Sequence, residues 1–579
     1  MKKLIVTLVI TAFLVVAAAP AFSQQGDPKF AKSLENYLDA LWKFYPTSAT
    51  LAGYNKYNDK LEDLGKGNLE KRNDALDTFN QEFVAKIDKT KLSPEQQSDL
   101  EMVIDSIDLE LLRHEQLVPW EYNPLYYNEI IVNSIGSLLT REFAPLDARV
   151  KSAVERAKAI PGLIKQAKEN LKTPAQIYTE TAIKQFAGIL DFYKNEVPKL
   201  SENKLQAEVA KLIPVLEDYQ KFLQNELLPK STGNFRLAEG HQRLLRLTAQ
   251  VNIPFEEISA RAKADSNNVR REMGIVSLGL FRLMYPKVNM EQMSTQMNEE
   301  QFRTNLIKGV LDKLRAEHAG KDEFVNQVKA AADKVKAFIQ QGQLLNLPSD
   351  NVTLDSMPAF MKSGLLAKVI YPGAYETSGS YKVLLSTLPE ELSAEQAQGL
   401  MEEFNNYFLP FWAARHVFPG NIVPVAMTGK DPSVIKKMYP NQLLLLGWPV
   451  FMGEMLMNNG YENYDMKSRM LQLKQLLQVV IDYQLDLNIH QGGLTKEQAV
   501  SIMTQTGFQT PAEAERKWNQ ILLNPGFSAY AYIGYQELLD IEKEVKKIKG
   551  DAYIQKEFLQ KALSYGPISF RQLKAKITQ

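Results

Sequence analysis

The spacing of apolar residues constrains the fold of this 579-residue chain more than any other feature of its sequence. Near the start, Phe30, Leu34, Leu38 and Leu41 recur at intervals of three and four, and most of the chain repeats that spacing. This period puts the apolar side chains on one face of an α-helix, which must then be buried against other helices. We therefore predict a mainly α-helical fold.

Four segments match the capping-box pattern that begins a helix, in which Ser or Thr precedes Glu or Gln by three positions. They begin at Ser93, Ser393, Thr495 and Thr510, and two of them have proline at the first helical position. Because the hydroxyl groups of these residues cap backbone N–H groups, we expect them to be structural.

A single stretch has the β-branched, alternating pattern of extended chain. It covers residues 367–372 and 381–388, separated by a Gly/Ser-rich turn at 377–380, and predicts a small β element. Possible breaks lie at 229–240 and 346–358, but both are short and neither is low in complexity. We interpret them as hinges within one helical domain spanning 24–579.

The first 23 residues have the three parts of a signal peptide. Lys2 and Lys3 precede an apolar run at 4–19, and a small-x-small cleavage site ends at Ser23. We expect cleavage near Ser23/Gln24 and export to the periplasm or the extracellular space. No later segment has the roughly 20 apolar residues of a membrane span, so we expect the mature protein to have none.

Bulk composition excludes several classes of function. Lys and Arg together number 68, as do Asp and Glu, so no net charge favours nucleic acid or an anionic membrane as a partner. Cysteine is absent, which excludes disulfides, thiolate metal ligands, cysteine nucleophiles and a lipid-modified N-terminal cysteine. The 45% hydrophobic content predicts a large globular body. Nothing in the sequence specifies an oligomeric state.

Two segments combine Pro, Gly and aromatic residues in a recognisable order: A-R-H-V-F-P-G-N-I-V at 414–423 and L-G-W-P-V-F-M-G-E at 446–454. They resemble the paired motifs H-E-x-[YF]-P-G-H and E-G-W-x-[VL]-Y of the bacterial domain-of-unknown-function 885 family, whose members look like zincin-type metallopeptidases. Weaker blocks continue the resemblance along nearly the whole mature chain, at 46–53, 61–64, 123–127, 141–145, 489–499, 524–526 and 533–534. The resemblance implies a large zincin-like helical fold with the β element ahead of the motif helix.

At the positions that carry the chemistry, the chain departs from the family pattern. The resemblance places Arg415 at the first His, His416 at the catalytic Glu, Asn421 at the second His, and Leu446 at the Glu that would be a third ligand. A catalytic zinc needs three N/O ligands, an open water position and a nearby base. The resemblance thus implies zinc for intact members, and the substitutions predict a degenerate site without catalytic residues or metal here.

Arg415 cannot be a metal ligand, and its positive charge also repels a metal ion. At about 4 Å and an effective dielectric constant of about 20, a guanidinium and a zinc ion repel each other by about 8 kcal/mol. A permanent cation at a former ligand position could instead hold a carboxylate, such as a peptide C-terminus. The plainer alternative is that Arg415 pairs with Glu402 or Glu403.

Six residues are candidates for lining the pocket: Tyr375, Tyr381, Arg415, His416, Trp448 and His490. Of the five histidines, none is paired with another at i, i+4, and His490 is included because it lies within a family-like block. The extended chain around Tyr371–Tyr375 and Tyr381–Leu384 could offer its edge to an extended peptide.

We therefore predict an exported, zincin-like protein that binds peptide or protein ligands without cleaving them. One alternative is an active metal-dependent peptidase with other ligands, such as Glu454 together with His416 or His490. A second alternative is a structural envelope protein. The first interpretation predicts that no three N/O atoms converge within about 2–2.2 Å of one point around residues 415, 416, 421 and 446.

Overall fold

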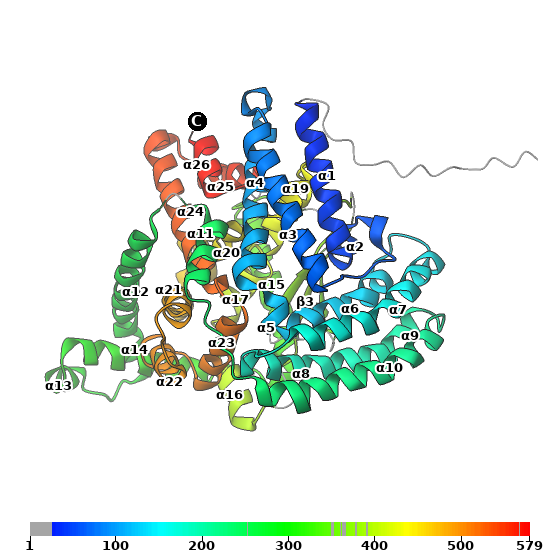
Figure 1. The fold of residues 1–579 in the computed structure, drawn as a ribbon. Helices are drawn as coiled ribbons and strands as arrows, with labels where there is room; N and C mark the ends of the chain where they lie inside the picture. Colours follow the sequence, from blue (N-terminus) through cyan, green and yellow to red (C-terminus); the bar gives the residue numbers. More distant parts are fainter. Residues whose placement is uncertain are drawn as a thin grey trace, which may run out of the picture.

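The computed structural model describes residues 26–578 except 252, 349–351, 359–360, 362–365, 377–378, 389–391 and 567. The predicted signal peptide and its cleavage position lie outside the described residues, as do Thr377 and Ser378 of the predicted turn. Helices form most of the described chain (Figure 1), which confirms the predicted mainly α-helical class.

The N-terminal part is a bundle of helices around two buried apolar clusters. Phe30, Leu34, Leu38 and Leu41 are all buried on one face of the first helix, as their spacing predicts. The helices are α1 (Pro28–Phe44), α2 (Pro46–Ala52), α3 (Lys66–Gln81), α4 (Pro94–Leu112), α5 (Pro119–Tyr122), α6 (Pro124–Thr140), α7 (Leu146–Asn170), α8 (Gln176–Asp191), α9 (Val197–Leu200) and α10 (Gln206–Lys221).

The C-terminal part contains the largest apolar cluster, which extends from Leu245 to Ile577. Its first helices are α11 (Glu239–Ala249), α12 (Phe255–Met284), α13 (Met290–Thr295), α14 (Glu299–Arg315), α15 (Phe324–Gln341), α16 (Ala394–Glu403), α17 (Leu409–His416) and α18 (Ile422–Gly429). The remaining helices are α19 (Val434–Met438), α20 (Gln442–Asn458), α21 (Met466–His490), α22 (Lys496–Ser501), α23 (Pro511–Leu523), α24 (Phe527–Lys549), α25 (Gln555–Ser564) and α26 (Phe570–Ile577).

The β element is a three-stranded sheet of β1 (Val352–Ser356), β2 (Ala367–Ile370) and β3 (Tyr381–Leu385). The sheet order is β1-β3-β2, with β1 parallel and β2 antiparallel to β3. The predicted extended segments thus correspond to β2 and β3. The interval 346–358, predicted as a break, contains the unpredicted strand β1.

The position of β1 corrects the expectation of a free strand edge after Tyr381. Every residue of β3 is paired with β1, and Lys382–Leu385 are paired with β2 as well. Since both sides of β3 are occupied over most of its length, no extended peptide can add to it; β1 and β2 are the outer strands.

Three of the four predicted capping boxes are present, at Ser93, Ser393 and Thr495. Thr510 accepts the Glu513 N–H, but the reciprocal bond from the Glu513 side chain is missing. Instead, the Thr510 N–H donates to the Glu403 carboxylate at 3.1 Å, and Glu513 pairs with Arg516. A tertiary contact has therefore replaced the local one.

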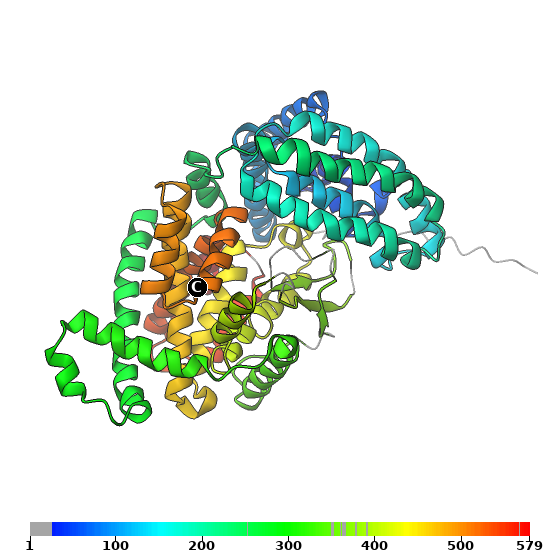
Figure 2. The same cartoon turned by 90° about the horizontal axis from the view of Figure 1, so that it is seen from below.

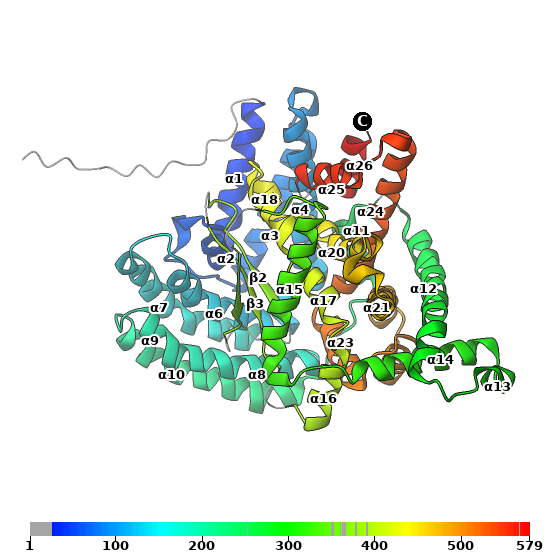
Figure 3. The ribbon, with the colours of Figure 1, turned by 180° about the vertical axis from the view of Figure 1, so that it is seen from behind.

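The two parts of the molecule lie side by side, with the sheet beside their junction (Figures 2 and 3). Ala374, Val434 and Ile435 complete one of the N-terminal apolar clusters. Ser98 Oγ of α4 also donates to Gln572 Oε1 of α26 at 2.9 Å. No helix in the described part of the chain is both long enough and apolar enough to cross a membrane.

Candidate functional site

A tight turn between α17 and α18 carries the first motif. The Gly420 N–H donates to the carbonyl oxygen of Ala414 at 2.8 Å. A Cβ atom at position 420 would lie 2.0 Å from the Arg415 carbonyl oxygen, so only glycine fits this turn. Asn421 Nδ2 donates to the His416 carbonyl oxygen at 3.2 Å. The turn thus brings residues 416 and 421 together, which a continuous helix would keep apart.

The second motif lies on α20 and packs directly on this turn. Trp448 is completely buried, and its Nε1 donates to the Pro419 carbonyl oxygen at 3.4 Å. Gly447 lets α20 approach α24, because a Cβ atom there would lie 2.3 Å from the carbonyl carbon of Gly534. The two motifs that the sequence suggests as partners are therefore in contact.

The framework residues of the two motifs are more deeply buried than the residues at the substituted positions. The framework residues are buried: Pro419, Gly420, Gly447, Trp448 and Phe451. The substituted residues are all only partly buried: Arg415, His416, Asn421 and Leu446. The side chains that differ from the family pattern are therefore the ones that solvent and ligands can reach.

Arg415 has neither a hydrogen bond nor an ion pair with any residue that the structure describes. Burial lowers the pKa of its guanidinium, and the charge of Asp482 partly opposes that effect. The acid suggested as a partner, Glu403, is instead buried in an ion pair with Lys474 at 2.7 Å and accepts a hydrogen bond from Gln478. The pairing of Arg415 with Glu402 or Glu403 is therefore not found.

His416 lies among positive charges. Burial, followed by the charges of Arg415, Arg516 and Lys517, lowers the pKa of His416 well below 6.5. Its ring packs on Trp412 with the centroids 4.5 Å apart. The imidazole is therefore neutral at pH 7 and can both donate and accept a hydrogen bond.

The acidic residues near these cations already form ion pairs with other residues. Asp482 pairs with Lys517 at 2.6 Å, and Glu513 pairs with Arg516 at 2.7 Å. Three cations thus face two acids, and Arg415 supplies the excess charge. In addition, Asp482 Oδ1 is buried and has no hydrogen-bond partner among the described residues.

The zinc ion implied by the resemblance does not fit these side chains. Arg415 is a cation, Leu446 has no donor atom, and the amide oxygen of Asn421 is a poor zinc ligand. No group of three or more His, Asp or Glu side chains in the described part of the chain is arranged to hold a metal ion. Glu454, the alternative ligand, accepts a hydrogen bond from Tyr535.

His490 lies in a different buried cluster, at the end of α21. Its ring stacks on His241 with the centroids 4.8 Å apart, and its Nε2 lies 3.2 Å from the Ile521 carbonyl oxygen. His241 Nε2 is 2.7 Å from Asp486, which also accepts the Gly526 N–H at the start of α24. The His241–Asp486 pair could not be predicted from the sequence, because its members lie 245 positions apart.

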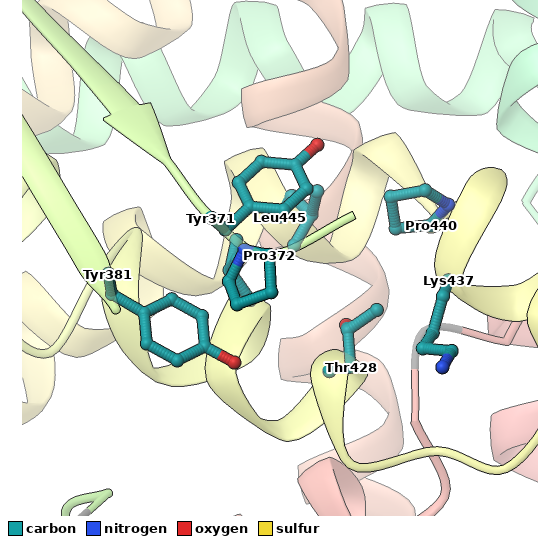
Figure 4. Close-up of a pocket in the computed structure, with 9 residues that line it drawn as sticks. Tyr371, Pro372, Tyr381, Thr428, Lys437, Pro440 and Leu445 are labelled. Atoms are coloured by element: carbon teal, nitrogen blue, oxygen red, sulfur yellow. The ribbon is translucent and has the colours of Figure 1, made fainter. Parts of the chain in front are cut away.

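The two candidate tyrosines lie in different places. Tyr375 OH accepts a hydrogen bond from Trp42 Nε1 at 3.0 Å, and burial raises the pKa of Tyr375 to about 12. Tyr381 lines a small pocket beside α18 and α20, with Tyr371, Pro372, Thr428, Lys437 and Leu445 (Figure 4). The pocket volume of about 20 Å³ suits one water molecule. Tyr381 therefore lines this pocket, whereas Tyr375, through its bond to Trp42, joins the N-terminal helices to the region around the sheet.

Solved structures share this fold. A protein from Shewanella oneidensis, described as a "putative lipoprotein of unknown function", superposes with a TM-score of 0.77 at 22% identity, covering 95% of this chain and 100% of its own. A protein from Colwellia psychrerythraea, described as a "putative lipoprotein", gives a TM-score of 0.72 at 14% identity, covering 95% of this chain and 98% of its own. At these identities the likeness shows the fold alone. No curated protein matches the chain.

A family model matches residues 46–577, most of the chain, and so includes both motifs. The chain belongs to the DUF885 family, bacterial proteins of unknown function.

Proposed function

We propose that this protein is an exported DUF885 member with a zincin-like, degenerate site that binds the carboxylate of a peptide or protein without cleaving it. The observation that carries the proposal is the Arg415 guanidinium, which is partly buried and unpaired within the described part of the chain. A cation held in that state favours an anionic ligand.

The charges around Arg415 support an anion rather than a cation. Arg516 and Lys517 are balanced by Glu513 and Asp482, so the charge of Arg415 is left over. A guanidinium presents a planar fork of N–H donors that matches both oxygens of a carboxylate. The C-terminus of a peptide is such a carboxylate.

The neighbouring residues have separate roles in this proposal. Neutral His416 offers a hydrogen bond to a peptide group beside the carboxylate. Trp448 is too deeply buried to contact a ligand and instead holds the turn through Pro419. The role of Trp448 is therefore to position Arg415 and His416.

Export is part of the proposal and rests on the signal-peptide pattern at 1–23. The similar structures from Shewanella and Colwellia are described as lipoproteins, which are exported proteins. This chain has no cysteine to carry a lipid. The expected location is thus the periplasm or the extracellular space, without a covalent lipid anchor.

Peptide binding is the direct test. A library of synthetic peptides with free C-termini is screened against the purified mature protein, and the best binder is titrated calorimetrically beside its C-terminally amidated form. We expect amidation and Arg415→Ala each to weaken binding at least tenfold, since hydrogen bonds to charged groups contribute about 1.5–3 kcal/mol. Arg243→Ala, at an exposed position on α11, is the matched control. Equal binding of the peptide by Arg415→Ala and wild type would contradict the proposal.

Metal analysis tests the non-catalytic part separately. Purified protein is assayed for zinc and for peptide hydrolysis with and without chelator. We expect substoichiometric zinc and no chelator-sensitive turnover. One zinc ion per chain, with hydrolysis abolished by chelator, would establish the peptidase alternative instead.

A further inference from the structure

Helix α12 forms an outer edge of the molecule, and the segment through α13 extends farthest from the core on that side (Figures 1 and 3). One face of the helix packs against α14 and α21, and Met273, Val276 and Leu280 are buried there. The opposite face of its C-terminal half is open to solvent. This face has an unusual composition.

Four large apolar residues are exposed within 14 positions of this region. The exposed fractions are 69% for Ile275, 38% for Leu278, 74% for Leu283 and 42% for Val288. No other stretch of that length in the described part of the chain exposes more than two. Clustered exposed apolar residues mark interaction surfaces, whereas single ones are ordinary.

Three exposed cations accompany them: Arg271, Arg282 and Lys287. None has a hydrogen bond or ion pair with another described residue. The only acid between positions 269 and 290 is Glu272, which is partly buried and paired with Arg469. The surface is thus locally positive, although the whole chain has equal numbers of acidic and basic residues.

Helical geometry places the two kinds of side chain together. At about 100° per residue, Arg271, Ile275, Leu278 and Arg282 fall within about 60° of the circumference of α12. Leu283 lies about 80° from Ile275, at the border of the same face. Leu283 and the following Lys287 and Val288 therefore extend this face toward α13.

We propose that this α12 face, defined by Arg271, Ile275, Leu278, Arg282, Leu283, Lys287 and Val288, docks on an anionic phospholipid membrane surface. Leu and Ile side chains enter the boundary between headgroups and acyl chains, and neighbouring Arg and Lys side chains contact the anionic headgroups. Long basic side chains reach the headgroups while their stems lie along apolar surface.

The charge of this face decides between the possible occupants. A second copy docking through the same face would bring three unpaired cations against three others, which disfavours a symmetric dimer. A membrane of anionic phospholipid supplies both the negative charge and the apolar layer. This proposal uses none of the residues around Arg415, so each can fail without the other.

Vesicle sedimentation tests the proposal with the full mature protein. Vesicles of phosphatidylglycerol and phosphatidylethanolamine are compared with vesicles of phosphatidylcholine alone, at low and high salt. We expect binding to the anionic vesicles that weakens with salt. Removing one cation, as in Arg282→Ala, should weaken binding about fivefold, following about 1 kcal/mol per basic residue near the surface.

Ile275→Glu/Leu283→Glu should abolish sedimentation with the vesicles, because it puts two acids on the face. Val84→Glu, at another exposed apolar position, is the matched control and should bind like wild type. Circular dichroism of each variant verifies folding. Three results would overturn the proposal: no binding by wild type, equal binding to neutral vesicles, or unchanged binding by the double variant. A dimer in sedimentation velocity that is lost in the double variant would assign the face to a second copy instead.

Discussion

The indole nitrogen of Trp448 on α20 donates a hydrogen bond to the carbonyl oxygen of Pro419 in the turn after α17, at 3.4 Å. This bond links two motifs that are about 30 residues apart in sequence and explains why a buried tryptophan is needed beside a Pro-Gly turn. Because Trp448 is completely buried, its ring also fills the space between the turn and α20. The position of Arg415 therefore depends on a residue that no ligand touches.

Replacing Trp448 with alanine should destabilise the protein by about 3–5 kcal/mol, because the change removes a large buried ring and leaves a cavity. Trp448→Phe keeps much of the volume and should cost less. Urea unfolding followed by circular dichroism measures both. Equal unfolding midpoints for Trp448→Ala and wild type would contradict this account of the turn.

The crossing of α20 and α24 predicts a second effect. A Cβ atom at Gly534 would lie 2.0 Å from the Leu443 carbonyl oxygen, so Gly534→Ala must push the two helices apart. We expect a loss of about 1–3 kcal/mol in the free energy of unfolding. The matched control is Gly162→Ala on α7, where nothing lies within 4 Å of the added atom. That variant should be stabilised by up to about 1 kcal/mol, because alanine favours a helix.

Local patterns predicted much of this structure because they depend on neighbours in sequence. The stripe of Phe30, Leu34 and Leu38 and the capping box at Ser93 need only three or four residues of context. The framework of the candidate site, Pro419-Gly420 and Gly447-Trp448, was predicted instead from the resemblance of two short blocks to the family motifs. Their contact with each other came only from the resemblance.

Features set by distant partners could not be predicted. Strand β1 was interpreted as part of a break because the Pro-Ser-Asp-Asn sequence at 348–351, just before it, is typical of a turn. Thr510 was predicted to begin a complete capping box, but Glu403, 107 positions earlier, accepts its N–H. The lack of an ion pair for Arg415 among the described residues depends likewise on Glu403 being paired with Lys474, which no local pattern shows.

The Glu403–Lys474 pair gives a third prediction. Both side chains are almost completely buried and their charged atoms are 2.7 Å apart. Lys474→Met would leave the Glu403 carboxylate buried without its cation, and we expect a loss of about 3–5 kcal/mol. Adding Glu403→Leu should recover most of that loss, because the unpaired charge is removed. Urea unfolding of the single and double variants measures the difference, and a double variant less stable than Lys474→Met would contradict the argument.

The last prediction concerns the contribution of His416 to the loss of stability at acid pH. The folded state lowers the pKa of His416 well below 6.5, first through burial and then through Arg415, Arg516 and Lys517. As the pH falls below 6.5, the unfolded chain binds a proton at this position that the folded protein does not, so stability falls. The contribution is at most about 1.4 kcal/mol for each pH unit, and it is present in full above pH 6.5.

His416→Gln should therefore reduce the slope of the free energy of unfolding against pH between 6.5 and 5. His318→Gln, outside the site, serves as the control. Arg415→Ala should reduce the slope partly, since it removes one of the three repelling cations. If His416→Gln and wild type have the same slope in urea unfolding across this range, the folded state does not lower the pKa of His416 as the structure indicates.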